Sequence, residues 1–203
     1  MPTRIERSCE EIRFRGSDNL GNANQRAIYN DTGDGPGRDV MAGVDAIQKL
    51  GFVDESKIAV TGWSYGGYMT TWLIGHYHIW KSAIAGASVA DWNEEYNLSD
   101  MGGWYTRQFF KVSPWVGDNL KDYVAHSPIT YADQIKTPTL IMSDTGDARV
   151  PIAQSYQLYH ALKDDGVPVK FLAYPVPGHF PDDPIRYQDV YRRWLDWLDQ
   201  YLK

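Results

Sequence analysis

Four short apolar runs constrain the fold of this chain more than any other feature. They lie at residues 57–61, 82–87, 138–142 and 169–173. Segments whose apolar residues recur at helical spacing lie before, between and after them, at 38–50, 65–74, 151–166 and 185–201. Buried strands that alternate with helices are typical of an α/β fold, with a mostly parallel sheet and helices on both faces. Chemistry in such sheets lies beyond the carboxyl ends of the strands, so the residues that follow each run are the first candidates.

Length and charge exclude several classes of function. The 203 residues fit one domain, which we predict to span 1–203. A net charge of −6 disfavours a nucleic-acid partner, and no 18-residue apolar stretch predicts a membrane span. No apolar leader is visible, so we expect a cytoplasmic protein. The glycine-rich stretch at 33–37 follows no strand and lacks a P-loop lysine, and we expect neither a cofactor nor a metal.

The first apolar run is followed by the motif GWSYG at 62–66. A G-x-S-x-G that lies between a strand and a helix is typical of a nucleophile elbow, in which a tight turn lifts the serine out of the sheet. Ser64 is therefore the candidate nucleophile. The backbone N–H of Tyr65 is the candidate donor to a developing oxyanion.

Two carboxylates follow the third run, and physical reasoning does not choose between them. Asp144 stands at the end of the predicted strand, and Asp147 stands three residues further along in the loop. A serine–histidine pair needs a carboxylate that orients the imidazole. Either aspartate can supply it, and either can instead form a turn or cap a helix.

His179 directly follows the fourth run, in a loop rich in glycine and proline. The other four histidines lie at helix ends, in a helix or in an irregular segment, where packing or exposure accounts for them. Ser64, an aspartate of the third strand end and His179 then follow the chain order of the α/β-hydrolases. We therefore predict a Ser–His–Asp triad.

Five motifs together resemble the catalytic domain of the prolyl oligopeptidase family, the S9 serine peptidases. They are RGS at 15–17, GPGRD at 35–39, GWSYGGY at 62–68, GDARVP at 146–151 and PGH at 177–179. The resemblance runs from about residue 14 to the end of the chain and implies the α/β-hydrolase fold.

The resemblance also implies a role for single residues. Ser64 would be the nucleophile and His179 the general base. Asp147, two residues before the arginine of the R-V pair, would be the orienting acid in preference to Asp144. Arg149 would contact a carbonyl of the substrate, although an ion pair with Asp144 or Asp147 is an equal alternative. Trp63, beside the nucleophile, is a further candidate for substrate contact.

The sequence departs from this family before the first motif. The β-propeller, the first strands of the sheet and the H-G-G-P segment have no match. In the family, a tyrosine just after that segment supplies a second oxyanion donor, so this donor has no match either. We expect a sheet of about five strands whose first strand, near residues 12–15, forms an exposed edge. Bare edges pair with other chains, so we expect a homo-oligomer through this edge.

The resulting hypothesis is a serine hydrolase that forms an acyl-enzyme. We expect it to cleave carboxylic esters of small acyl groups and, more weakly, peptide or acylaminoacyl bonds, because amides need a complete oxyanion hole. Aromatic residues between 92 and 115 could line an acyl pocket or belong to the core. The alternative, from another class, is a catalytically impaired fragment that acts as a binding or structural module.

Overall fold

A parallel four-stranded sheet forms the centre of the protein. The computed structural model describes residues 8–203, and within them the strands lie in the order β1-β2-β3-β4. Their bounds are β1 Ala59–Trp63, β2 Ser82–Gly86, β3 Thr139–Gly146 and β4 Val169–Pro177. All three pairings are parallel, so the four carboxyl ends meet at one edge. The mostly parallel α/β fold is therefore confirmed.

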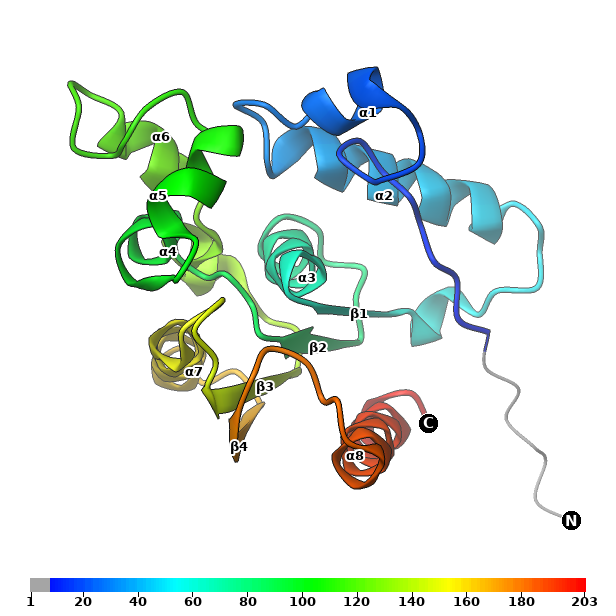
Figure 1. Ribbon diagram of the computed structural model, residues 1–203. Helices are drawn as coiled ribbons and strands as arrows, with labels where there is room; N and C mark the ends of the chain where they lie inside the picture. Colours follow the sequence, from blue (N-terminus) through cyan, green and yellow to red (C-terminus); the bar gives the residue numbers. More distant parts are fainter. Residues whose placement is uncertain (1–7) are drawn as a thin grey trace, which may run out of the picture.

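Long helices cover both faces of this sheet (Figure 1). One face carries α3 (Tyr65–His76) and α7 (Ile152–Asp164), and α2 (Asp34–Gln48) packs outside α3. The opposite face carries α8 (Pro184–Tyr201). Alternate side chains of one strand serve the two layers. In β3, Ile141 joins the larger apolar core, whereas Leu140 and Met142 pack with Val190 and Trp197 of α8.

Short helices build the segment between β2 and β3, as its irregular sequence predicts. They are α4 (Trp92–Leu98), α5 (Gly102–Tyr105), η2 (Thr106–Gln108), α6 (Leu120–Ala125) and η3 (Pro128–Gln134). Two more precede β1, namely α1 (Asn22–Arg26) and η1 (Glu55–Lys57). In the described part of the chain, no helix is long and apolar enough to cross a membrane.

The strand expected at 12–15 is wrong, because these residues form no ladder with the sheet. They lie along α2 instead. The side chain of Ile12 packs over Gly43, and the Arg15 guanidinium donates two hydrogen bonds of 2.8 Å to Asp39. Side-chain contacts with a helix thus replace the expected backbone pairing. Within residues 8–203 the edge strands are β1 and β4. β1 is half-buried along most of its length and β4 mixes half-buried with exposed residues, whereas β2 is buried throughout.

Candidate active site

Ser64 occupies the turn between β1 and α3, in a backbone conformation that side chains rarely adopt. Its φ is 60° and its ψ is −122°. The turn is so tight that a Cβ on Gly62 would lie 2.3 Å from the backbone of Gly66. Strain of this kind persists only where the surroundings enforce it, and it is common at reactive groups. The strand–turn–helix context predicted from the motif is therefore present.

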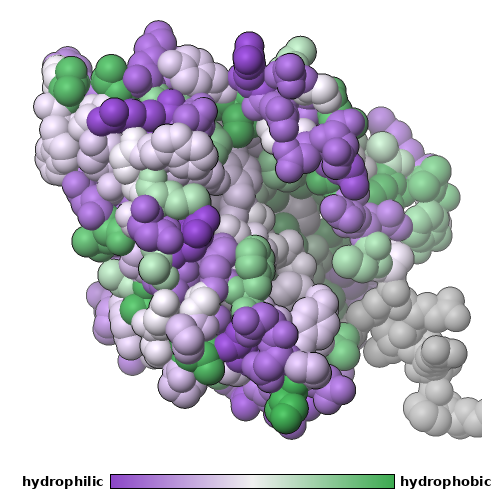
Figure 2. Space-filling view, viewed as in Figure 1, coloured by the Kyte–Doolittle hydropathy of each residue, from purple (hydrophilic) through white to green (hydrophobic). Residues whose placement is uncertain are grey.

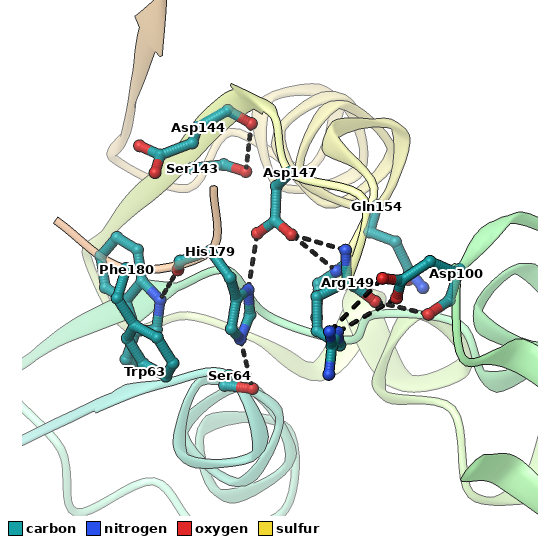
Figure 3. Close-up of polar contacts among 12 residues, drawn as sticks. Trp63, Ser64, Asp100, Ser143, Asp144, Asp147, Arg149, Gln154, His179 and Phe180 are labelled. Carbon is teal, nitrogen blue, oxygen red and sulfur yellow. Dashed lines mark hydrogen bonds and ion pairs between the residues drawn. The ribbon is translucent and has the colours of Figure 1, made fainter. Parts of the chain in front are cut away.

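Three of the predicted residues meet at the carboxyl ends of the strands (Figure 3). The Oγ of Ser64 lies 2.7 Å from Nε2 of His179, and Nδ1 of the same ring lies 2.7 Å from Oδ2 of Asp147. The His179 side chain is 15% exposed and that of Asp147 is fully buried. A substrate can therefore reach the serine and one side of the imidazole, while the carboxylate is shielded from water.

Asp147 and Asp144 have different surroundings, and this decides which of them contacts the histidine. The second oxygen of Asp147, Oδ1, accepts hydrogen bonds from the backbone N–H groups of Arg149 (2.8 Å) and Val150 (3.0 Å). Neither side-chain oxygen of Asp144 has a hydrogen-bond partner, and its nearest cation is Arg186 at 3.8 Å. Burial raises the pKa of the Asp144 carboxyl above its usual range. Only Asp147 is held as an oriented acceptor.

Trp63 contacts the loop that carries His179. Its indole Nε1 donates a 2.6 Å hydrogen bond to the backbone carbonyl of His179, and its ring lies against Phe180 (Figure 3). The edge strand β1 thereby fixes the backbone of the loop that carries the imidazole. We therefore expect Trp63 to position this loop.

The side chain of Arg149 pairs with neither of the two aspartates considered for it. Its Nε lies 3.0 Å from Oδ1 of Asp100, and its backbone carbonyl accepts a hydrogen bond from Ser99. These contacts tie the loop after β3 to the segment after α4 (Figure 3). The side chain is 44% exposed, so the guanidinium remains accessible beside the triad.

The N-terminus of α3 provides the donor side of the site. The first N–H groups of a helix have no acceptor within it and carry partial positive charge, and the N–H of Tyr65 is the first of these. The Tyr65 side chain is held by contacts outside the triad. Its hydroxyl donates to the Thr32 carbonyl (2.9 Å), and its ring packs between Phe14 and Phe109.

The sequence model of the prolyl oligopeptidase family matches residues 11–203. The chain belongs to this family. It is 32% identical over 192 residues to the uncharacterized peptidase YuxL of Bacillus subtilis, which is 91% of this chain and 29% of that protein. It is 32% identical over 201 residues to the acylamino-acid-releasing enzyme of Arabidopsis thaliana, which is 95% of this chain and 26% of the plant protein.

Solved structures of the prolyl oligopeptidase family show the same architecture. The acylaminoacyl peptidase of Pyrococcus horikoshii superposes with a TM-score of 0.86 at 28% identity, over 94% of this chain and 32% of that one. The fold is thus that of the α/β-hydrolases. The chain spans between about a quarter and a third of the length of these relatives.

A buried polar pair behind the triad was not predicted from the sequence. The Gln154 side chain, on α7, accepts from the backbone N–H groups of Ala90 and Asp91 and donates to a Glu95 oxygen on α4 at 3.2 Å. Burial raises the pKa of Glu95 to about 8, and the charge of nearby Asp147 adds to the effect. No local pattern marks these residues, because the contact joins positions 59 apart.

Metal ligation is the remaining chemistry to consider for the histidines. His76 stacks on Trp72, and its Nδ1 lies 2.8 Å from the Trp72 carbonyl, so packing accounts for this residue. Among residues 8–203, no group of three or more His, Cys, Asp or Glu side chains is placed to hold a metal ion.

Proposed function

We propose that this chain is a serine hydrolase that works through an acyl-enzyme, with Ser64, His179 and Asp147 as its catalytic triad. The continuous hydrogen-bonded row from Ser64 through His179 to Asp147 carries the proposal. Packing alone does not require these three residue types at three separate strand ends. Membership of a family of serine peptidases supports the same reaction class.

The mechanism follows from the two hydrogen bonds of the imidazole. Nε2 of His179 accepts the hydroxyl proton as the Ser64 oxygen attacks the carbonyl carbon of the substrate. Asp147 holds the proton on Nδ1 and stabilises the imidazolium that forms. The Tyr65 N–H donates to the oxyanion. His179 then protonates the leaving group, and water releases the acyl group by the same steps in reverse order.

The substrate class is a proposal that rests on the donor side of the site. We assign esters of small acyl groups as the substrates cleaved fastest, with short peptides or acylaminoacyl bonds cleaved more slowly. An ester alkoxide leaves with less help from proton transfer than an amine does, so a site with few oxyanion donors favours esters. Two relatives carry names of peptidases that release acylamino acids, and this supports the peptide arm. Arg149, accessible beside the triad, is the proposed contact for a substrate carbonyl.

Hydrolysis of p-nitrophenyl acetate and butyrate tests the proposal, together with covalent labelling by a fluorophosphonate. We expect turnover and labelling in the wild type, and loss of both in Ser64→Ala, with kcat lower by on the order of 10⁶-fold. Ser56→Ala, a change at an exposed serine outside the site, is the matched control and should keep both signals. Hydrolysis of aminoacyl p-nitroanilides then measures the proposed slower cleavage of peptide bonds. A folded wild type that resists labelling would refute the proposal and favour a binding module.

A further inference from the structure

An open cleft lies between two segments that are far apart in the chain. Its volume is about 560 Å³, within the range of small-molecule sites. One wall is formed by α1 and the residues after it, and the other by η2. A 2.8 Å hydrogen bond from the Asn30 N–H to the Phe109 carbonyl joins the walls. Figure 2 shows the surface hollowed between the parts over α1 and α2 and the parts over α4 to α6.

The cleft combines an apolar floor with two positive charges. Ile28 and Phe109, 9% and 6% exposed, form the floor. Arg26 and Arg107 line the two walls, and no Asp or Glu of the described residues lines the cleft. In residues 8–203 the Arg26 guanidinium has no hydrogen-bond or ion-pair partner, and that of Arg107 has only a 3.3 Å contact with the Tyr96 hydroxyl. Two cations without a carboxylate stand out in a chain of net charge −6.

Phe109 connects this cleft with the chemistry. Its ring packs against that of Tyr65, the residue after the proposed nucleophile, with ring centres 5.9 Å apart. His179 comes from the opposite side, since the connection from β4 to α8 lies across α3 from α1 and α5 (Figure 1). The imidazole protonates the leaving group, so the leaving group lies on its side. The acyl part of a substrate therefore extends toward the cleft.

We propose that this cleft binds a carboxylate on the acyl part of the substrate, with Arg26 and Arg107 as its anchors and Ile28 and Phe109 contacting the carbon chain. The inference rests on the proposed function and adds the substrate class: acyl groups that bear a negative charge away from the carbonyl. Guanidinium groups bind carboxylates with strong, directed hydrogen bonds, and an apolar floor excludes water around them.

A series of p-nitrophenyl esters tests the inference. The charged members are monoesters of succinic, glutaric, adipic and suberic acid, and each is compared with the neutral ester of equal chain length. We expect kcat/KM of the wild type to favour the charged ester by tenfold or more at one or more lengths. The preference should fall about tenfold in a combined Arg26→Gln and Arg107→Gln variant, mainly through KM. It should also weaken with added salt, because ions screen exposed charges. Lys49→Gln, which removes a charge at the far end of α2, should leave the preference unchanged.

Binding gives a second readout that needs no turnover. Suberate is titrated calorimetrically into Ser64→Ala protein with and without the two arginine changes, and circular dichroism verifies folding. Binding that the arginine changes abolish would support the cleft even if no ester is hydrolysed, in which case only the proposed function fails. Hydrolysis of neutral esters without any preference for charge, or suberate binding that ignores the arginines, would overturn the inference and leave the proposed function standing.

Discussion

The two sides of Ser64 are built in different ways. On the acid–base side, the loops after β3 and β4 meet, and the buried Asp147 receives three hydrogen bonds, from His179, Arg149 and Val150. On the oxyanion side, the edge strand β1 and the N-terminus of α3 provide one backbone donor, at Tyr65, and β1 is only half-buried. The residues proposed for proton transfer are therefore held by several hydrogen bonds, whereas the proposed oxyanion donor borders an edge strand.

Replacing Asp147 by Asn breaks the strongly fixed side and has the largest expected effect. An amide cannot hold the proton on Nδ1 of His179 and stabilise the imidazolium as a carboxylate does. We expect kcat for p-nitrophenyl butyrate to fall about 10⁴-fold. The measurement is steady-state hydrolysis at neutral pH, and circular dichroism verifies the fold.

Asp144→Asn is the matched control for that change. The Asp144 oxygens accept no hydrogen bond, and Arg186 keeps Asp182 at 2.9 Å when the charge at 144 is removed. We expect kcat within about threefold of the wild type. A larger loss in Asp144→Asn than in Asp147→Asn would show that the acid is misassigned.

The buried carboxyl of Glu95, on the acid–base side, makes the free energy of unfolding depend on pH. Its pKa of about 8 lies above the ordinary value of 4.5, so the folded state keeps a proton that the unfolded state releases between these values. The free energy of unfolding therefore falls as pH rises from about 4.5 to 8, and the loss is complete above 8. Asp147 and Asp100 face the same carboxyl and strengthen the effect.

Glu95→Gln should remove this dependence. We expect the variant to be more stable than the wild type by roughly 5 kcal/mol at pH 9 and to differ little at pH 4.5, because the amide resembles the protonated acid. Urea unfolding at both pH values measures it, with the exposed Glu55→Gln as control. An equal effect at both pH values would contradict the assigned cause.

Trp63 links the two sides, because it belongs to the edge strand yet holds the His179 loop. Trp63→Phe removes the donor to the His179 carbonyl and keeps a ring beside Phe180. A lost hydrogen bond of this kind corresponds to about 1.4 kcal/mol, or tenfold in rate. We expect kcat to fall about tenfold while KM stays constant. A rise in KM alone would instead assign the indole to substrate binding.

The sequence predicts the acid–base side of the site better than the oxyanion side. Strand ends and the order of Ser64 and His179 are local signals, and they suffice for the sheet and the candidate site. Local signals fail where contacts between distant segments determine the structure. Arg149 pairs with Asp100, which is 49 positions away, and the segment at 12–15 packs on α2 instead of joining the sheet. Asp147 and Asp144 are both buried and differ in their hydrogen-bond partners, which no single-sequence pattern reveals, so the family resemblance had to choose between them.

The β1 edge gives the last and smallest effect. We propose that two copies pair along β1, because no strand of the described residues pairs with its outer edge and Thr61 is exposed. Light scattering at micromolar concentration should give twice the chain mass of 23.1 kDa. Thr61→Lys should shift it toward one copy, since charged residues on edge strands oppose pairing. His160→Lys, an added charge on α7, should not. A wild type that stays monomeric would contradict this pairing. The difference between the two sides of Ser64 would then be a property of the single chain.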